Sequence, residues 1–122
     1  MRVSVVGVCG VGKSSLVSRL RYAGYDAHEV AQEHSYVPDM WRRLHPPRVL
    51  IFLDANLDTV WRRRPGTLLS QSLYQDMQAR LAHARENAGL FISTDNLTEE
   101  EVAGTALAHL TRLFGQGIIR PA

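Results

Sequence analysis

The residues with the clearest chemical meaning lie near the start of the chain, at positions 7–14, GVCGVGKS. They match the pattern G-x-x-x-x-G-K-[S/T], the Walker A pattern, in which backbone amides surround phosphate oxygens. Lys13 is the only lysine among the 122 residues, and it stands where the pattern requires an amine. We therefore predict that this segment, named here the glycine loop, binds phosphate groups.

Each residue type of the glycine loop has a physical task. Glycine allows backbone dihedrals and close approach that a side chain would block, which predicts this role for Gly7, Gly10 and Gly12. Lys13 would bridge the β- and γ-phosphates, and the Ser14 hydroxyl would bind Mg²⁺. The predicted phosphate-binding residues are Gly7, Val8, Cys9, Gly10, Val11, Gly12, Lys13, Ser14 and Ser15.

Cys9 is the only cysteine, so the chain has neither a disulfide framework nor a zinc-binding spacing. Its place in the glycine loop leaves two interpretations open. It is either a thiol that a bound nucleotide protects from alkylation, or a small side chain that fits the loop.

Strands and helices are predicted to alternate along the chain. The predicted strands are residues 2–6, 26–31, 49–54 and 90–94. The first predicted helix is residues 13–23, and the second is capped by Asn56 and ends at Pro65. The third starts with a Ser72–Gln75 capping box and runs to Ala88. The fourth starts with a Thr98–Glu101 capping box and precedes a tail from Gly115. Residues 32–48 are predicted as loop or short irregular helix. This order indicates an α/β fold, a three-layer αβα sandwich around a short parallel sheet that binds ligands at the carboxyl ends of its strands.

Length and composition limit the function classes. The 122 residues, 45% of them apolar, predict one domain over residues 1–122. A net charge of +2 without a lysine-rich block argues against nucleic acid as a partner. No apolar run reaches the roughly 20 residues of a membrane span, and no cleavable leader is recognisable. We therefore expect a cytoplasmic protein without membrane contact, and the oligomeric state stays open.

Three segments resemble the small P-loop kinases, which include adenylate, shikimate, gluconate and nucleoside kinases. The first is the glycine loop. The second is residues 49–54 (VLIFLD) with 56–64 (NLDTVWRRR), which are similar to the strand that leads into the arginine-bearing lid of these kinases. The third is residues 92–102 (ISTDNLTEEEV), which are similar to their last strand and the loop after it. The resemblance implies a P-loop NTPase fold, ATP and Mg²⁺ as cofactors, and transfer of the γ-phosphate to a small-molecule acceptor.

The resemblance also implies roles for particular residues. A lid near residues 57–70 would bring Arg62, Arg63 or Arg64 over the phosphates and neutralise charge on the transferring group. The alternative is a solvated helix end whose cations complement the helix dipole. The nucleotide base would rest on the third segment, where Asn96 is the predicted contact.

The carboxylate that serves Mg²⁺ has two interpretations. Asp54 ends an apolar strand, a pattern that holds Mg²⁺ in P-loop proteins, but the strand before the lid has no settled catalytic residue in the family. If Asp54 is excluded, Glu29, Glu33 and Asp39 become the candidates near the acceptor. We choose Glu33 as the general base for an acceptor hydroxyl, with an ordinary surface carboxylate as the alternative.

The chain also departs from the family pattern. It has four predicted strands where these kinases generally have five, and residues 32–48 are short where the family carries its acceptor-binding insertion. A nucleotide-binding regulatory module with slow or no hydrolysis is therefore the competing hypothesis. A Ras-type GTPase is the third possibility, but a chain whose only lysine is Lys13 has no Asn-Lys-x-Asp sequence, so a preference for guanine would need some other contact. Lys13→Ala is expected to abolish triphosphate binding or turnover and leave the fold intact.

Overall fold

Four short strands form a parallel sheet in the computed structural model, which describes residues 2–43 and 45–115. The strands β1 (Arg2–Gly7), β2 (Asp26–Glu29), β3 (Val49–Asp54) and β4 (Leu90–Ser93) lie in the order β2-β1-β3-β4. β1 and β3 occupy the centre, and nearly all of their residues are buried, as an apolar, β-branched sequence in a parallel sheet requires. The predicted α/β class with a short parallel sheet is confirmed.

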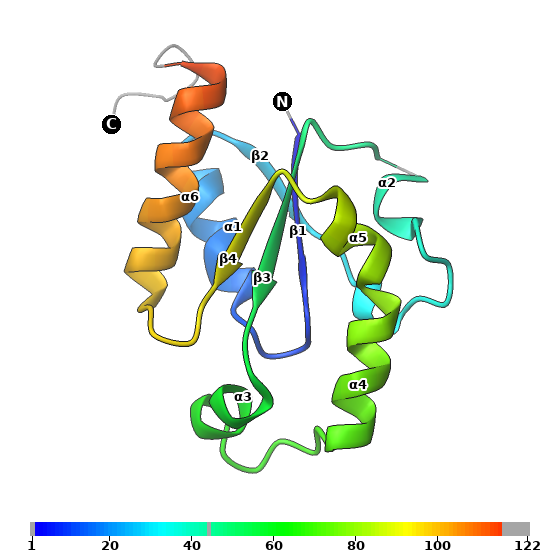
Figure 1. Cartoon of the computed structure of the whole chain (residues 1–122). Coiled ribbons are helices and arrows are strands. Elements are labelled where there is room, and N and C mark those ends of the chain that lie inside the picture. Colours follow the sequence, from blue (N-terminus) through cyan, green and yellow to red (C-terminus); the bar gives the residue numbers. More distant parts are fainter. Residues whose placement is uncertain (1, 44, 116–122) are drawn as a thin grey trace.

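Helices cover both faces of the sheet (Figure 1). α1 (Lys13–Tyr22) and α6 (Glu99–Phe114) pack together on one face, while α5 (Ala82–Asn87) packs on β3 from the other face and continues from α4 (Gln71–Arg80). Right-handed crossovers explain this arrangement, because the steps from β1 to β2 and from β3 to β4 run in opposite directions across the sheet. Their helices therefore lie on opposite sides of the sheet.

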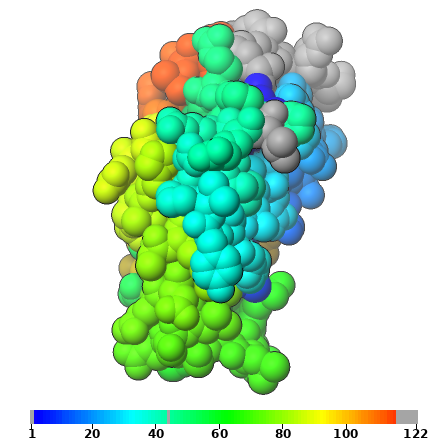
Figure 2. All heavy atoms as spheres, turned by 90° about the vertical axis from the view of Figure 1, so that its right-hand side faces the viewer, coloured from blue at the N-terminus to red at the C-terminus, as the bar shows by residue number. Residues whose placement is uncertain are grey.

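The segment between β2 and β3 contains η1 (Gln32–His34) and α2 (Met40–Arg43) and lies against α4 (Figure 2). One buried amide holds it there. The Gln32 Nε2 donates to Val37 O at 2.8 Å and to Arg80 O at 3.3 Å, and its Oε1 accepts from Trp41 N at 2.8 Å. Trp41 is buried and serves the core, and the predicted short irregular helix is confirmed.

A short helix, α3 (Leu57–Arg63), lies at the carboxyl edge of the sheet. Asn56 precedes it as predicted, but the Asn56 side chain makes no capping bond, and its backbone N–H donates to Asp95 Oδ1 at 2.8 Å. At the other end, Arg63 Nη1 donates to Thr94 Oγ1 at 3.0 Å, and Nη2 donates to the Thr94 carbonyl. Both ends of α3 are thus tied to the residues that follow β4.

Several predicted boundaries shift. The Ser72–Gln75 capping box is wrong, since α4 is capped two residues earlier by Ser70, whose Oγ accepts from Leu73 N at 3.0 Å. The helix predicted to run to Ala88 is divided at Leu81 into α4 and α5. The second strand ends at Glu29, because the chain turns into η1 three residues later.

The Thr98–Glu101 capping box of α6 is confirmed. That helix ends at Phe114, Gly115 follows it as predicted, and the rest of the predicted tail lies outside the described residues. Among the helices that the structure describes, none has the length and apolar character needed to cross a membrane.

Candidate nucleotide-binding site

The glycine loop connects β1 to α1 and has the backbone shape predicted for it. Gly7, Gly10 and Gly12 have φ angles of +156°, +86° and +107°. A Cβ on Gly7 would lie 2.4 Å from the carbonyl oxygen of Leu53, its partner in the sheet, so only glycine fits there. Gly12 precedes the first residue of α1 in a left-handed conformation and turns the free amides of that helix toward the loop.

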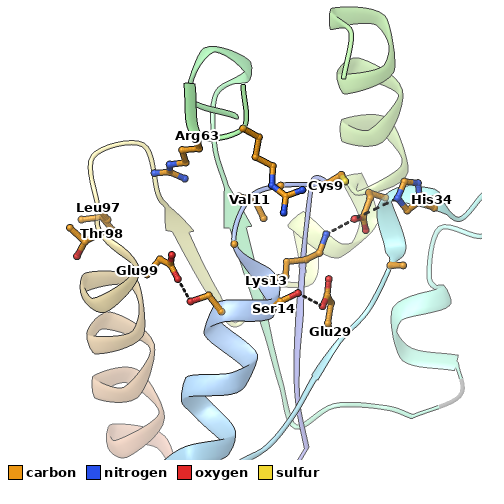
Figure 3. Close-up of a pocket in the computed structure, with 16 residues that line it drawn as sticks. Cys9, Val11, Lys13, Ser14, Glu29, His34, Arg63, Leu97, Thr98 and Glu99 are labelled. Carbon is orange, nitrogen blue, oxygen red and sulfur yellow. Dashed lines mark hydrogen bonds and ion pairs between the residues drawn. The ribbon is translucent and has the colours of Figure 1, made fainter. Parts of the chain in front are cut away.

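Lys13 is buried beneath the loop, and its amine donates to three protein oxygens. The Nζ lies 2.6 Å from Gly7 O and 3.3 Å from Val8 O, and it forms an ion pair with Glu33 Oε2 (Figure 3). Both side chains of the pair are almost fully buried, at 5% and 4% exposure. The second oxygen of the carboxylate, Glu33 Oε1, is buried and has no partner among the described residues.

Ser14 faces a carboxylate from the neighbouring strand. Its hydroxyl donates to Glu29 Oε2 at 3.0 Å, and Glu29 is the last residue of β2 (Figure 3). A hydroxyl and a carboxylate at this spacing are the hard oxygen ligands that suit Mg²⁺, which completes its shell with water and phosphate oxygens. In the described part of the chain, no group of three or more His, Cys, Asp or Glu side chains is placed to hold a metal alone.

The opposite side of the site is formed by the start of α6 and the residues before it. Leu97, Thr98 and Glu99 line it, and the Ser15 hydroxyl donates to Glu99 Oε2 (Figure 3). This contact joins residues that are 84 positions apart in the sequence. Glu99 is a site residue that the sequence analysis missed, because no local pattern marks a carboxylate that meets Ser15 only in the fold.

The three consecutive arginines have different surroundings. Arg64 lies on the glycine loop, close enough that a Cβ on Gly10 would be 3.2 Å from its Cδ. Arg63 lines the same cavity but donates to Thr94, as described above. Arg62 is exposed and does not line the cavity. The structure therefore singles out Arg64 as the arginine placed over the loop and available to a ligand.

Asp95 holds the start of α3 in place, because its carboxylate accepts from the Asn56 backbone N–H. Burial raises the pKa of its carboxyl, but hydrogen bonds from the Asn56 amide and from the Thr59 and Ser93 hydroxyls, with the charge of Arg63, outweigh it and lower the pKa overall. The ionised form is therefore the one that holds the start of α3.

These groups surround a cavity of about 820 Å³, within the size range of small-molecule sites. It is lined by Cys9, Gly10, Val11, Gly12, Lys13, Ser14, Ser15, Glu29, Ala31, Glu33, His34, Arg63, Arg64, Leu97, Thr98 and Glu99. Lys13, Arg63 and Arg64 lie among these residues with three glutamates and His34, so the affinity of the cavity for an anion would depend on where the charges lie and not on an overall positive charge.

Some predicted residues lie outside this cavity. Asp54 Oδ1 accepts from Gln78 Nε2 and Arg85 Nη2, each at 3.3 Å, on the α4 and α5 side of the sheet. Asn96 is exposed beside the lining residues. Gly7 and Val8 lie below the cavity and contribute their carbonyls to Lys13.

Asp39, the remaining carboxylate candidate, precedes α2, accepts from the side chains of Arg42 and Arg43, and does not line the cavity. A hydrogen bond from Arg43, with a smaller contribution from Arg42, lowers the pKa of its carboxyl. Of the four carboxylates considered from the sequence, the structure therefore places Glu29 and Glu33 in the cavity.

Comparison of the sequence with protein-family models and with curated proteins gives no match. The geometry of the site is therefore the basis for assigning its function.

Proposed function

We propose that this chain is a P-loop protein that binds ATP with Mg²⁺ and transfers the γ-phosphate to a hydroxyl group of a small molecule. The observation that carries this proposal is the cavity above the glycine loop, where Lys13, the Ser14–Glu29 pair and Arg64 converge. The parallel sheet with a glycine loop between its first strand and first helix is the arrangement expected of a P-loop NTPase fold. Because ATP is a cytoplasmic phosphate donor, the proposal also places the protein in the cytoplasm.

Glu33 is the proposed general base. Its carboxylate is buried beside the amine that would hold the β- and γ-phosphates, and a base must lie within hydrogen-bond reach of the hydroxyl that attacks. Lys13 would leave Glu33 for the phosphates, which frees the carboxylate to accept the proton of the acceptor hydroxyl. The ion pair is thus the resting arrangement of two groups that separate when substrates bind.

Ser14 and Glu29 would hold Mg²⁺, which neutralises phosphate charge when it is bound. Arg64 would add positive charge over the transferring group from the other side of the loop. Leu97, Thr98 and Glu99 form the side on which the nucleoside would rest, since they lie across the loop from His34, the residue after Glu33 (Figure 3).

The test has two steps. Calorimetric titration with ATP, in the presence and absence of Mg²⁺, measures binding, and we expect Ser14→Ala and Glu29→Gln to weaken the magnesium-dependent part. Incubation with γ-labelled ATP and pooled hydroxyl compounds then follows the label. Label on a small molecule supports the kinase, whereas failure to bind ATP contradicts the proposal at its first step.

The second candidate is a nucleotide-binding regulatory module with slow or no hydrolysis. The observation that favours it is that the Lys13 amine already donates to three protein oxygens. A triphosphate must therefore displace a buried ion pair before it can bind. Label that stays in ATP or appears only as free phosphate, with ATP bound, would favour this function over the kinase.

A further inference from the structure

The contacts of Lys13 indicate which end of the cavity receives the transferred phosphate. In a glycine loop of this kind the lysine reaches the β- and γ-phosphates. The Lys13 amine points toward the side where His34 lies, away from Glu99 (Figure 3). The γ-phosphate end therefore faces one wall of the cavity, termed here the acceptor wall, which consists of Glu29, Ala31, Glu33 and His34.

The acceptor wall carries two carboxylates and neither a lysine nor an arginine. Glu33 is the more buried of the two, and its Oε1 has no hydrogen-bond donor within the described residues. His34 is half-exposed, with its Nε2 at 3.9 Å from Glu33 Oε2. The wall thus offers acceptor oxygens to a substrate and has an imidazole as its only basic group.

Three arginines on neighbouring elements, Arg80, Arg42 and Arg43, are held by contacts within the protein. The guanidinium of Arg80 lies over the ring of Tyr36, 4.5 Å from its centroid, and donates to the Tyr36 hydroxyl at 3.1 Å and to the backbone carbonyl of Glu33 at 3.3 Å. Arg42 and Arg43 both bond to Asp39 on α2. None of these three arginines lines the cavity, so they do not form a clamp for a carboxylate or phosphate on the acceptor.

Binding of a triphosphate would leave Glu33 as the uncompensated carboxylate of this wall, since Glu29 would hold Mg²⁺ with Ser14. When Lys13 turns to the phosphates, Glu33 loses the cation that neutralises it in the resting arrangement. A hydroxyl or ammonium group on the acceptor can replace that partner, because both donate hydrogen bonds to a carboxylate. A second anion placed there would face both the γ-phosphate and Glu33, and like charges in a partly buried site repel strongly.

We propose that the phosphate acceptor is a hydroxyl compound without an anionic group, either uncharged or bearing an ammonium group. This inference rests on the proposed function. In the transfer, the acceptor oxygen bonds to the γ-phosphorus, the bond from that phosphorus to the β–γ bridging oxygen breaks, the hydroxyl proton passes to Glu33, and ADP leaves. Nucleoside monophosphates, sugar phosphates and hydroxy acids are thereby excluded, although they carry suitable hydroxyls.

The experiment uses the complete chain with Mg²⁺ and γ-labelled ATP, and two matched pools. One pool holds sugars, polyols, nucleosides and amino alcohols, and the other holds carboxylate or phosphate analogues of the same compounds. We expect the best acceptor of the first pool to be labelled at least 100-fold faster than any member of the second. Label on an anionic acceptor at a comparable rate would overturn this inference and leave the kinase function standing. Label only in free phosphate, with ATP bound, would overturn the proposed function and this inference with it.

A substitution in the acceptor wall tests whether the charge of this wall determines which acceptor is used. His34→Arg adds a permanent cation to the acceptor wall, and we expect it to raise the ratio of anionic to uncharged acceptor labelling by about 10-fold or more. The matched control is His45→Arg, because His45 is exposed and does not line this cavity. An unchanged ratio in His34→Arg would contradict control of acceptor choice by the charge of this wall.

Discussion

At the scale of single residues, the ion pair between Lys13 and Glu33 determines how the site behaves without a ligand. The amine already donates to three oxygens, so an incoming phosphate exchanges one partner for another instead of meeting a free charge. A carboxylate beside a phosphate site also weakens anion binding until it is neutralised. Under the proposed function, the same carboxylate would oppose nucleotide binding and serve the transfer.

The first prediction follows for Glu33→Gln. Removal of the negative charge leaves the Lys13 amine without its counter-ion, and we expect ATP to bind about 10-fold more tightly, because the phosphates then compensate a buried cation. Phosphate transfer should fall about 100-fold or more, since an amide cannot accept the proton. Calorimetric titration and a steady-state assay measure the two effects. Glu86→Gln, an exposed glutamate of α5, is the matched control, and an equal loss of affinity and turnover would contradict the dual role.

The second prediction revises what the sequence suggested for Lys13→Ala. The substitution leaves a buried carboxylate without its cation, and we expect a loss of about 3 to 5 kcal/mol in the free energy of unfolding. The double variant Lys13→Ala with Glu33→Gln should recover most of that stability and still fail to bind ATP. Urea denaturation and calorimetry separate the two properties. An unchanged free energy of unfolding in Lys13→Ala would show that the negative charge of Glu33 is stabilised by groups other than the Lys13 amine.

At the scale of elements, the end of α3 and the residue after it place three adjacent arginines in three environments, and this leads to the third prediction. Arg64→Ala should lower phosphate transfer about 100-fold at unchanged stability, because Arg64 lies on the glycine loop. Arg63→Ala should cost about 1 to 2 kcal/mol of stability through its bonds to Thr94. Arg62→Ala, on the exposed side, is the control for both. Assays of turnover and urea denaturation on the three variants test this assignment, and equal effects at all three positions would refute it.

The fourth prediction concerns the pH dependence of the α3 anchor. The folded-state pKa of Asp95 is lowered from its ordinary value of 3.8, so its contribution to stability is fully present above that value and is lost as the pH falls below it. We expect Asp95→Asn to cost about 1 kcal/mol at pH 7 and progressively less toward pH 3. Urea denaturation of both proteins across this range measures the difference. A difference that stays constant down to pH 3 would show that the carboxylate charge is not involved.

At the scale of the whole molecule, the sheet order explains why the site forms where it does. β1 lies between β2 and β3, so the glycine loop emerges beside the carboxyl end of β2, which carries Glu29. The register also places Gly7 directly beside Leu53 of β3. The loop is therefore built into the centre of the sheet.

The fifth prediction compares two glycines of the loop. Gly7→Ala should destabilise the protein by about 3 kcal/mol or more, since the new Cβ meets the backbone oxygen of Leu53 at 2.4 Å. Gly12→Ala meets no atom within 4 Å, and its cost should be only the roughly 1 to 2 kcal/mol of a left-handed backbone. The midpoints of urea denaturation, compared at an unchanged denaturant slope, measure the loss of stability in both variants. Equal losses would mean that the sheet adjusts around position 7.

Much of this fold could be predicted because its signals are local. The apolar run of β3 and the capping box of α6 are complete in the sequence, and both were found where predicted. The break at Leu81 was missed because the apolar pattern continues while α4 turns to η1 and α5 to β3. That change of packing partner is a property of the fold and leaves no mark on the spacing.

The candidate site divides in the same way. The glycine loop is a contiguous pattern and was predicted as a unit. The residues that contact this loop were harder to predict. Ser14 bonds to Glu29 on a neighbouring strand, and Ser15 bonds to Glu99, which is 84 positions away in the sequence. The sequence named Glu33 among several carboxylates, but its burial beside Lys13 depends on how η1 packs.

The single lysine also makes the protein a selective substrate for proteolysis. A protease that cuts only after lysine has one bond to attack in the whole chain, between Lys13 and Ser14 at the first turn of α1. Because Lys13 is only 5% exposed, cleavage requires the loop and the start of that helix to open. Under native conditions with fast reclosing, the cutting rate reports the free energy of this local opening. One time course of digestion thus measures the stability of the glycine loop separately from that of the whole protein.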